Sequence, residues 1–104
     1  MLKLITKPTW HDYAPGVRLL IAPLTRSKLR QLVAASEEDG APSLEQLVAN
    51  HTLQGWEGLA DDEGQTLDVT PENAMLVMDS LELGPWIEER ARVTARTPED
   101  ELKN

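Results

Sequence analysis

The pattern of hydrophobic positions along the chain changes near residue 23. Before it, short apolar runs (LKLI and VRLLIAPL) flank a YAPG turn, which is typical of extended chain. Residues 17–22 are the best strand candidate, and Pro23 should end that strand because proline cannot donate to a sheet ladder. Beyond it, apolar residues recur at helical spacing. The pattern predicts an α+β fold, in which a short N-terminal β region precedes about four mainly amphipathic helices in a single compact domain.

The first predicted helix follows Pro23. Thr25 or Ser27 is its expected N-cap, because Ser and Thr hydroxyls accept hydrogen bonds from free amides of a first turn. Gly40 is its expected C-terminal cap, with Pro42 just beyond. The positions that share one stripe at helical spacing are Leu29, Leu32, Val33 and Ser36.

A second helix is predicted to begin at Ser43. Ser43 and Gln46 fit a capping box, in which the serine hydroxyl and the glutamine side chain each satisfy a free backbone amide of the other residue. The residues expected on its buried face are Leu44, Leu47, Val48 and His51.

Residues 52–69 break the helical spacing at three glycines. We interpret this stretch as a strand or loop bent at the acidic turn DDEG. Thr70 then caps a third helix, with Pro71 at the first helical position, where its missing N–H costs nothing. The predicted stripe of this helix comprises Ala74, Val77, Met78 and Leu81.

Gly84 and Pro85 precede a fourth predicted helix, WIEERARVTAR, over residues 86–96. Thr97 and Pro98 should end it. We therefore expect one α+β domain over residues 1–96, and residues 97–104 are predicted to be a disordered C-terminal tail.

The composition limits the classes of protein that fit. The 104 residues, of which 40% are hydrophobic, are enough for one modest core. The absence of cysteine excludes a disulfide framework, a thiolate zinc site and a cysteine nucleophile. The longest apolar runs are far shorter than the roughly 20 residues of a membrane helix, and the N-terminus lacks a signal-peptide pattern. We expect a cytoplasmic protein with no membrane partner.

The charge is unevenly distributed. The net charge of −8 argues against a nucleic-acid partner, which would need a basic surface. Residues 1–35 carry six Lys or Arg and one acid, whereas residues 36–82 carry twelve acids and no Lys or Arg. Either both regions are simply solvated faces, or the basic and acidic parts of neighbouring copies, or of a copy and its client, attract each other. The second interpretation predicts weak self-association that salt weakens.

The sequence offers no arrangement typical of catalysis. His11 and His51 lie in different predicted elements without nearby ligand partners. The DDEG turn does not fit a calcium loop, because Gly64 comes too early, and no G-x-S-x-G motif presents a nucleophile. We expect no catalytic, cofactor-binding or metal-binding residues, no cofactor and no enzymatic activity.

Trp10, Trp56 and Trp86 each lie beside a turn. Each either covers the core, which suits a large ring with one N–H to satisfy, or anchors an interface. For Trp56, we expect the flanking Gly55 and Gly58 to bend the backbone, so that the indole folds back across helix positions such as Leu47 and Val77. The residues predicted to contact a partner are Trp56, Leu59, Asp61, Asp62, Glu63, Met75 and Trp86.

The order of GWEG, DDEG, TPEN and PWIEE resembles small tail assembly chaperones of long-tailed bacteriophages. Their central W-E-G-V-x-D-x-x-G and T-x-E-N stretch corresponds to Trp56, Glu57, Gly58, Leu59, Asp61, Gly64, Thr70, Glu72 and Asn73. PGVRLLIAPLT also resembles the strand that leads into their first helix. The similarity covers roughly residues 14–93, and the segment before Trp10 and the tail after Arg96 depart from it.

The resemblance implies a non-enzymatic phage or prophage protein of the host bacterial cytoplasm. It would bind the tape measure protein and assist the assembly of tail tube subunits around it. An acidic surface with Trp, Met and Leu positions suits the capture of an apolar helical client. Two other classes stay open: a small acidic regulatory or antitoxin-like protein-binding module, and an accessory subunit of an enzyme. Gene order distinguishes them, because a tail chaperone gene should lie between the tail tube and tape measure genes.

Overall fold

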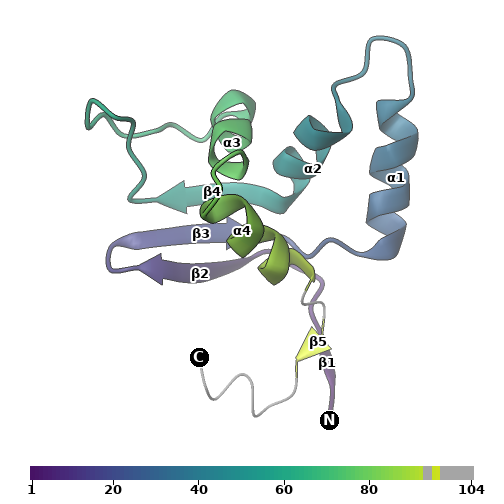
Figure 1. Ribbon diagram of the computed structural model, residues 1–104. Coiled ribbons are helices and arrows are strands. Elements are labelled where there is room, and N and C mark those ends of the chain that lie inside the picture. Colours follow the sequence, from purple (N-terminus) through teal and green to yellow (C-terminus); the bar gives the residue numbers. More distant parts are fainter. Residues whose placement is uncertain (93–94, 97–104) are drawn as a thin grey trace.

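The computed structural model describes residues 1–92 and the backbone of residues 95–96 (Figure 1). The predicted C-terminal tail, residues 97–104, lies outside the described residues. The strands are β1 (Lys3–Leu4), β2 (Thr9–Ala14), β3 (Val17–Ile21), β4 (Leu53–Glu57) and β5 (Ala95–Arg96). The helices are α1 (Arg26–Ser36), α2 (Leu44–Thr52), α3 (Pro71–Met78) and α4 (Leu83–Arg92). The predicted α+β class and the four helices are confirmed.

The main sheet has the strand order β2-β3-β4, and both pairings are antiparallel. β2 and β3 form a hairpin across Pro15 and Gly16, as the YAPG turn predicts. β4 comes from the stretch interpreted as a strand or loop, so β structure is not confined to the N-terminal region. Its residues join the free edge of β3, with Trp56 opposite Leu19.

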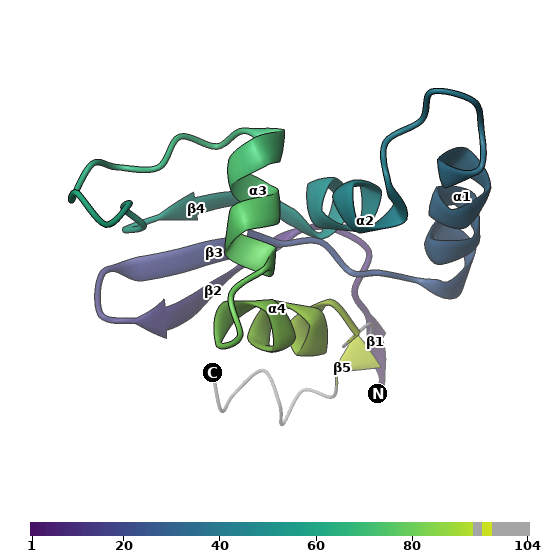
Figure 2. The same ribbon diagram turned by 45° about the horizontal axis from the view of Figure 1, so that its top comes forward.

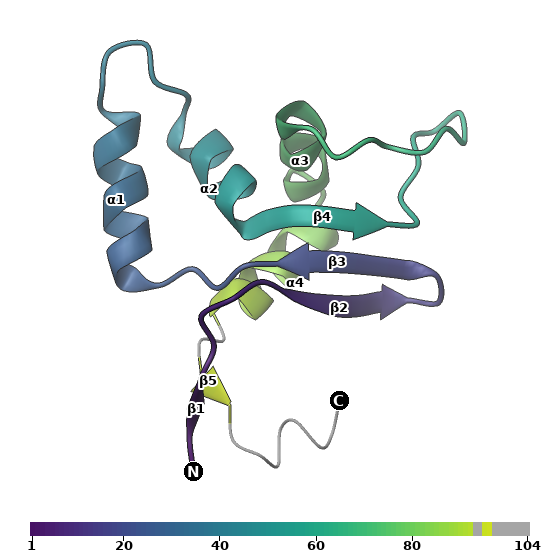
Figure 3. The same cartoon turned by 180° about the vertical axis from the view of Figure 1, so that it is seen from behind.

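One face of this sheet carries the core. α3 and α4 cover that face, whereas the opposite face has no helix over it when the molecule is seen from behind (Figures 1 and 3). Alternation along β3 places Leu19 and Ile21 against the helices, because successive strand residues point to opposite faces. The other members of the buried cluster are Ala49, Leu53, Trp56, Ala74, Val77, Ile87 and Ala91.

All three predicted N-caps are present. Thr25, rather than Ser27, caps α1, and its hydroxyl accepts a hydrogen bond from the Lys28 amide. Ser43 accepts from the Gln46 amide at the start of α2. Thr70 caps α3, with Pro71 in its first turn as predicted.

The predicted C-terminal cap of the first helix is wrong. α1 ends at Ser36, and the amides of Glu37 and Glu38 donate to the carbonyl groups of Ala34 and Ala35. These short-range bonds satisfy the last turn three residues before Gly40 is reached. Gly40 lies in the following loop, with a φ of 76°.

Only half of the predicted capping box forms. The Gln46 side chain donates to Asn50 Oδ1 at 2.8 Å and to the Pro71 carbonyl oxygen at 3.0 Å, instead of returning to the Ser43 amide. The Pro71 carbonyl is within reach because α3 packs beside α2. The glutamine therefore joins two helices, a role that local sequence could not indicate.

The fourth helix begins and ends earlier in the chain than predicted. α4 begins at Leu83 and ends at Arg92, and the backbone of residues 95–96 pairs with β1. Ser80 sets the early start, because its hydroxyl accepts from the amides of Glu82 and Leu83. Position 84, in the first turn of α4, requires glycine because a Cβ there would overlap the Met78 carbonyl group.

Two predicted helix faces are less buried than expected. Each residue of α1 is at least partly exposed, and α2 fully buries Ala49 and Thr52 in place of the predicted face. The predicted residues Leu44, Leu47, Val48 and His51 are half-buried. In α3, Ala74 and Val77 are buried as predicted, but Leu81 lies beyond the helix and is almost fully exposed.

Candidate partner-binding surface

Trp56 is a core residue that also positions a loop. Only 6% of it is exposed, and its indole N–H donates to the Leu67 carbonyl oxygen at 2.9 Å. Val77 belongs to the same buried cluster, as predicted, whereas Leu47 is half-buried. The hydrogen bond spans 11 residues of sequence, so the indole fixes the 58–67 loop to the sheet.

The two glycines beside Trp56 act differently. Gly58 has a φ of 83°, and a Cβ there would overlap the Gly16 carbonyl oxygen in the β2–β3 turn. Gly55 has ordinary strand geometry in β4, and a Cβ there would make ordinary contacts with Leu20 and Trp10. The predicted backbone bend therefore belongs to Gly58 alone.

The acidic turn is a hairpin that is held by hydrogen bonds to its first residue, Asp61. Its Oδ1 accepts from the amides of Glu63 and Gln65, both at 2.9 Å, and Gly64 closes the turn with a φ of 85°. Asp61 is half-buried, whereas Asp62 and Glu63 are exposed. The first carboxylate therefore holds the turn together, and the next two are available to a partner.

This turn borders a hollow of about 400 Å³ between the 58–67 loop and α3. We call it the acidic-turn hollow, and the residues that define it are Leu59, Asp61, Asp62, Leu67, Leu76 and Leu83. Leu76 is 58% exposed although it is a large aliphatic side chain on a helix. The hollow is thus an apolar recess with carboxylates on one side.

The structure brings together only part of the predicted set. Leu59, Asp61 and Asp62 line the hollow, and Glu63 lies on the turn beside it. Trp56 is buried in the core to which Leu59 and Leu67 pack. Met75 and Trp86 lie elsewhere, the first in a separate groove between α2, α3 and α4 and the second against the β2–β3 hairpin.

Trp86 has aromatic and cationic neighbours. Its ring meets Tyr13 edge to face, with ring centroids 5.0 Å apart, and His11 with centroids 6.4 Å apart. The Arg90 guanidinium lies 3.8 Å from the ring centroid, and Arg90 Nη1 also donates to the Trp86 carbonyl oxygen. The contacts with Tyr13 and His11 hold α4 against β2, so Trp86 joins elements of the domain.

Sequence reasoning missed Leu67, Leu76 and Leu83 as lining residues of the hollow. Leu76 falls between the positions of the predicted α3 stripe. A large aliphatic residue outside the buried stripe of a short helix was the available signal.

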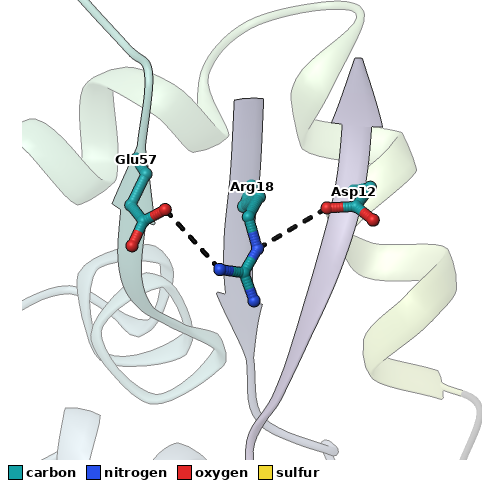
Figure 4. Close-up of polar contacts among 3 residues, drawn as sticks. All are labelled: Asp12, Arg18 and Glu57. Atoms are coloured by element: carbon teal, nitrogen blue, oxygen red, sulfur yellow. Dashed lines mark ion pairs between the residues drawn. The ribbon is translucent and has the colours of Figure 1, made fainter. Parts of the chain in front are cut away.

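Sequence reasoning also missed a charged row on the open sheet face. Arg18 Nε lies 3.5 Å from Asp12 Oδ1, and its Nη1 lies 3.6 Å from Glu57 Oε2 (Figure 4). The Arg18 guanidinium also lies 4.7 Å from the Trp10 ring centroid. These side chains are well exposed, so each ion pair contributes little stability. The row connects one residue from each strand of the sheet.

In the part of the chain that the structure describes, no group of three or more His, Asp or Glu side chains is placed to hold a metal ion. No helix among the same residues is long and apolar enough to cross a membrane.

Residues 9–104 match the family model described as YdaY prophage protein. The match includes all three strands of the main sheet and all four helices. Comparison with curated proteins and comparison with solved structures each found no match.

Proposed function

The chain belongs to the YdaY prophage protein family, and from this premise we propose that it is a non-enzymatic tail assembly chaperone. It would act in the host bacterial cytoplasm, bind an apolar segment of the tape measure protein and assist tail tube assembly. The observation that carries the proposal is the acidic-turn hollow, where Leu59, Leu67 and Leu76 lie beside Asp61 and Asp62.

The chemistry of the hollow suits a client that would otherwise aggregate. Each client Leu or Val side chain that becomes fully buried gains about 1.5–3 kcal/mol. Leu76 is exposed enough to contact such a side chain directly. Asp62 and Glu63 stay in water, where they attract Lys or Arg of the client and keep the complex soluble.

The resemblance to tail assembly chaperones supports the same surface. Of the residues that carry it, Gly58 allows the turn beside β3, Asp61 holds the hairpin and Thr70 caps the helix that bears Leu76. Three residues of the motif therefore help to build this hollow.

The test is co-expression with the tape measure protein of the same prophage. We compare the parent with Leu76→Gln and with Asp62→Asn/Glu63→Gln, and we leave Asp61 intact because it holds the turn. All three changed residues are exposed, so the fold should survive. The soluble fraction of the tape measure protein should fall several-fold with either variant.

Matched controls use residues of the same type away from the hollow. Leu81→Gln changes a leucine that is even more exposed, and Glu37→Gln/Glu38→Gln removes two carboxylates from the loop after α1. Both controls should keep the client soluble. If the hollow variants perform as well as the parent, the acidic-turn hollow has no part in client binding. If the parent itself does not protect the tape measure protein, the regulatory or antitoxin-like alternative gains support.

A further inference from the structure

α1 is the one described helix in which no residue is fully buried. It stands at the edge of the molecule beside α2, away from the sheet (Figures 1 and 2). Leu29 and Val33 are 40% and 37% exposed and lie one helical turn apart. An apolar pair on so exposed a helix indicates a face that could be covered by another molecule.

The same face is basic. α1 contains Arg26, Lys28 and Arg30 and no acidic residue. Arg26 lies three residues before Leu29, and Arg30 lies three residues before Val33, so each cation is next to an apolar side chain on the helix surface. We call these four residues, Arg26, Leu29, Arg30 and Val33, the α1 ridge.

A groove with apolar and acidic lining residues lies between α2, α3 and α4. Its charge is opposite to that of the α1 ridge. It has a volume of about 290 Å³. Its apolar lining includes Val48, Met75 and Met78, and its charged lining consists of Glu45, Asp79 and Glu88. We call it the acidic groove. Methionine side chains adapt readily to different apolar partners, which suits a docking surface.

The α1 ridge of the same molecule does not occupy this groove. Arg26 and Leu29 line an adjoining hollow that shares Val48 and Glu88 with the groove, but none of the described residues lining the groove itself comes from α1. The groove is therefore open to a helix from outside.

We propose that the acidic groove binds the α1 ridge of a second copy of this chain. Apolar side chains of the ridge would meet Val48, Met75 and Met78, while its cations would face the carboxylates of the groove. If each copy gives its ridge to the other, one two-fold dimer contains the contact twice. The four residues of the ridge are few beside the roughly 20–30 residues per side of a standard interface, so the dimer should be weak and should form at high concentration.

The first test is sedimentation of the full chain over a concentration series. At about 0.01 M ionic strength, where the Debye length is about 30 Å, dimer should appear as concentration rises. At about 1 M, where that length is about 3 Å, the dimer should weaken markedly. A chain that stays monomeric throughout the low-salt series would overturn the proposal.

A charge exchange between two variants tests the partners themselves. One variant is Arg26→Glu/Arg30→Glu, and the other is Glu45→Lys/Asp79→Lys. Glu88 is kept because it lies 4.0 Å from Arg92 on its own helix. Each variant alone should be monomeric, since like charges would meet, and an equimolar mixture should form the heterodimer. A mixture that stays monomeric, or single variants that dimerise like the parent, would overturn the proposal.

The control Asp62→Lys/Glu63→Lys makes the same type of charge change on the acidic turn. It should dimerise like the parent even if it loses client capture, so the two proposals can fail separately. Circular dichroism and thermal unfolding confirm that each variant is folded. If the parent is monomeric and Glu45→Lys/Asp79→Lys loses capture of the tape measure protein instead, the groove belongs to the client and the self-association proposal is wrong.

Discussion

Thr52 has a polar side chain whose surroundings do not fit its chemistry. It is only 1% exposed, and among the described residues its hydroxyl has no hydrogen-bond partner. Its backbone carbonyl is satisfied, because it accepts from the Ala22 amide at 2.9 Å where β3 leads toward α1. The backbone at this position thus joins two elements, while the side-chain oxygen is buried without compensation.

We predict that Thr52→Val stabilises the protein. Valine keeps the branched shape and removes a buried polar group whose lost hydrogen bonds cost about 1–3 kcal/mol. The free energy of unfolding in urea should rise by on the order of 1 kcal/mol. Thr70→Val is the matched control, and it should lower that free energy by about 1 kcal/mol because the Thr70 hydroxyl caps α3. Destabilisation by both variants would show that the Thr52 hydroxyl has a partner in solution.

At the scale of elements, the loop between β4 and α3 has two glycines with similar backbone geometry and different surroundings. Gly58 and Gly64 have φ angles of 83° and 85°. A Cβ at Gly58 would overlap the Gly16 carbonyl oxygen, whereas a Cβ at Gly64 would meet nothing within 4 Å. Position 58 therefore requires glycine for two reasons, its positive φ and the nearby β2–β3 turn. Position 64 favours glycine only because of its positive φ.

Substitution by alanine should separate these two requirements. Gly64→Ala should cost about 1–2 kcal/mol, which is the strain of a left-handed alanine. Gly58→Ala should cost clearly more, because the β2–β3 turn must also move. Urea unfolding of both variants, with Gly40→Ala (φ 76°, open surroundings) as a second reference, measures the difference. Equal losses at positions 58 and 64 would mean that the contact with Gly16 carries no cost.

At the scale of the whole molecule, the acidic residues of the middle segment repel one another. The protein carries a net charge of −8, and no Lys or Arg lies between residues 36 and 82. Such self-repulsion opposes the compact state and is weakened by screening ions.

We therefore predict that sodium chloride stabilises the monomer. In dilute protein, raising the ionic strength should increase Tm by a few degrees, since about 1 kcal/mol corresponds to roughly 4–8 °C in a domain of this size. The variant Glu37→Gln/Glu38→Gln/Asp39→Asn removes three charges from an exposed loop and should show a smaller rise. A Tm that falls as salt is added would show that favourable ion pairs outweigh the repulsion.

The sequence by itself determined the features that depend on neighbouring residues. Thr25, Ser43 and Thr70 cap their helices through bonds to an amide three residues away, and the YAPG turn closes a hairpin. Alternation and helical spacing were enough for the α+β class. The indole of Trp56, which was expected to fold back across helix positions such as Val77, is buried in one cluster with that residue.

Tertiary structure decided what depends on residues far apart in the sequence. Gln46 leaves its predicted cap for a carbonyl 25 residues away, and Trp56 bonds to a loop 11 residues away. The acidic-turn hollow exists only because that loop folds back beside α3, and the exposure of α1 follows from its packing mainly against α2. Local patterns show which side chains of a segment can be buried. The free energy that burial contributes depends on which distant part of the chain covers them.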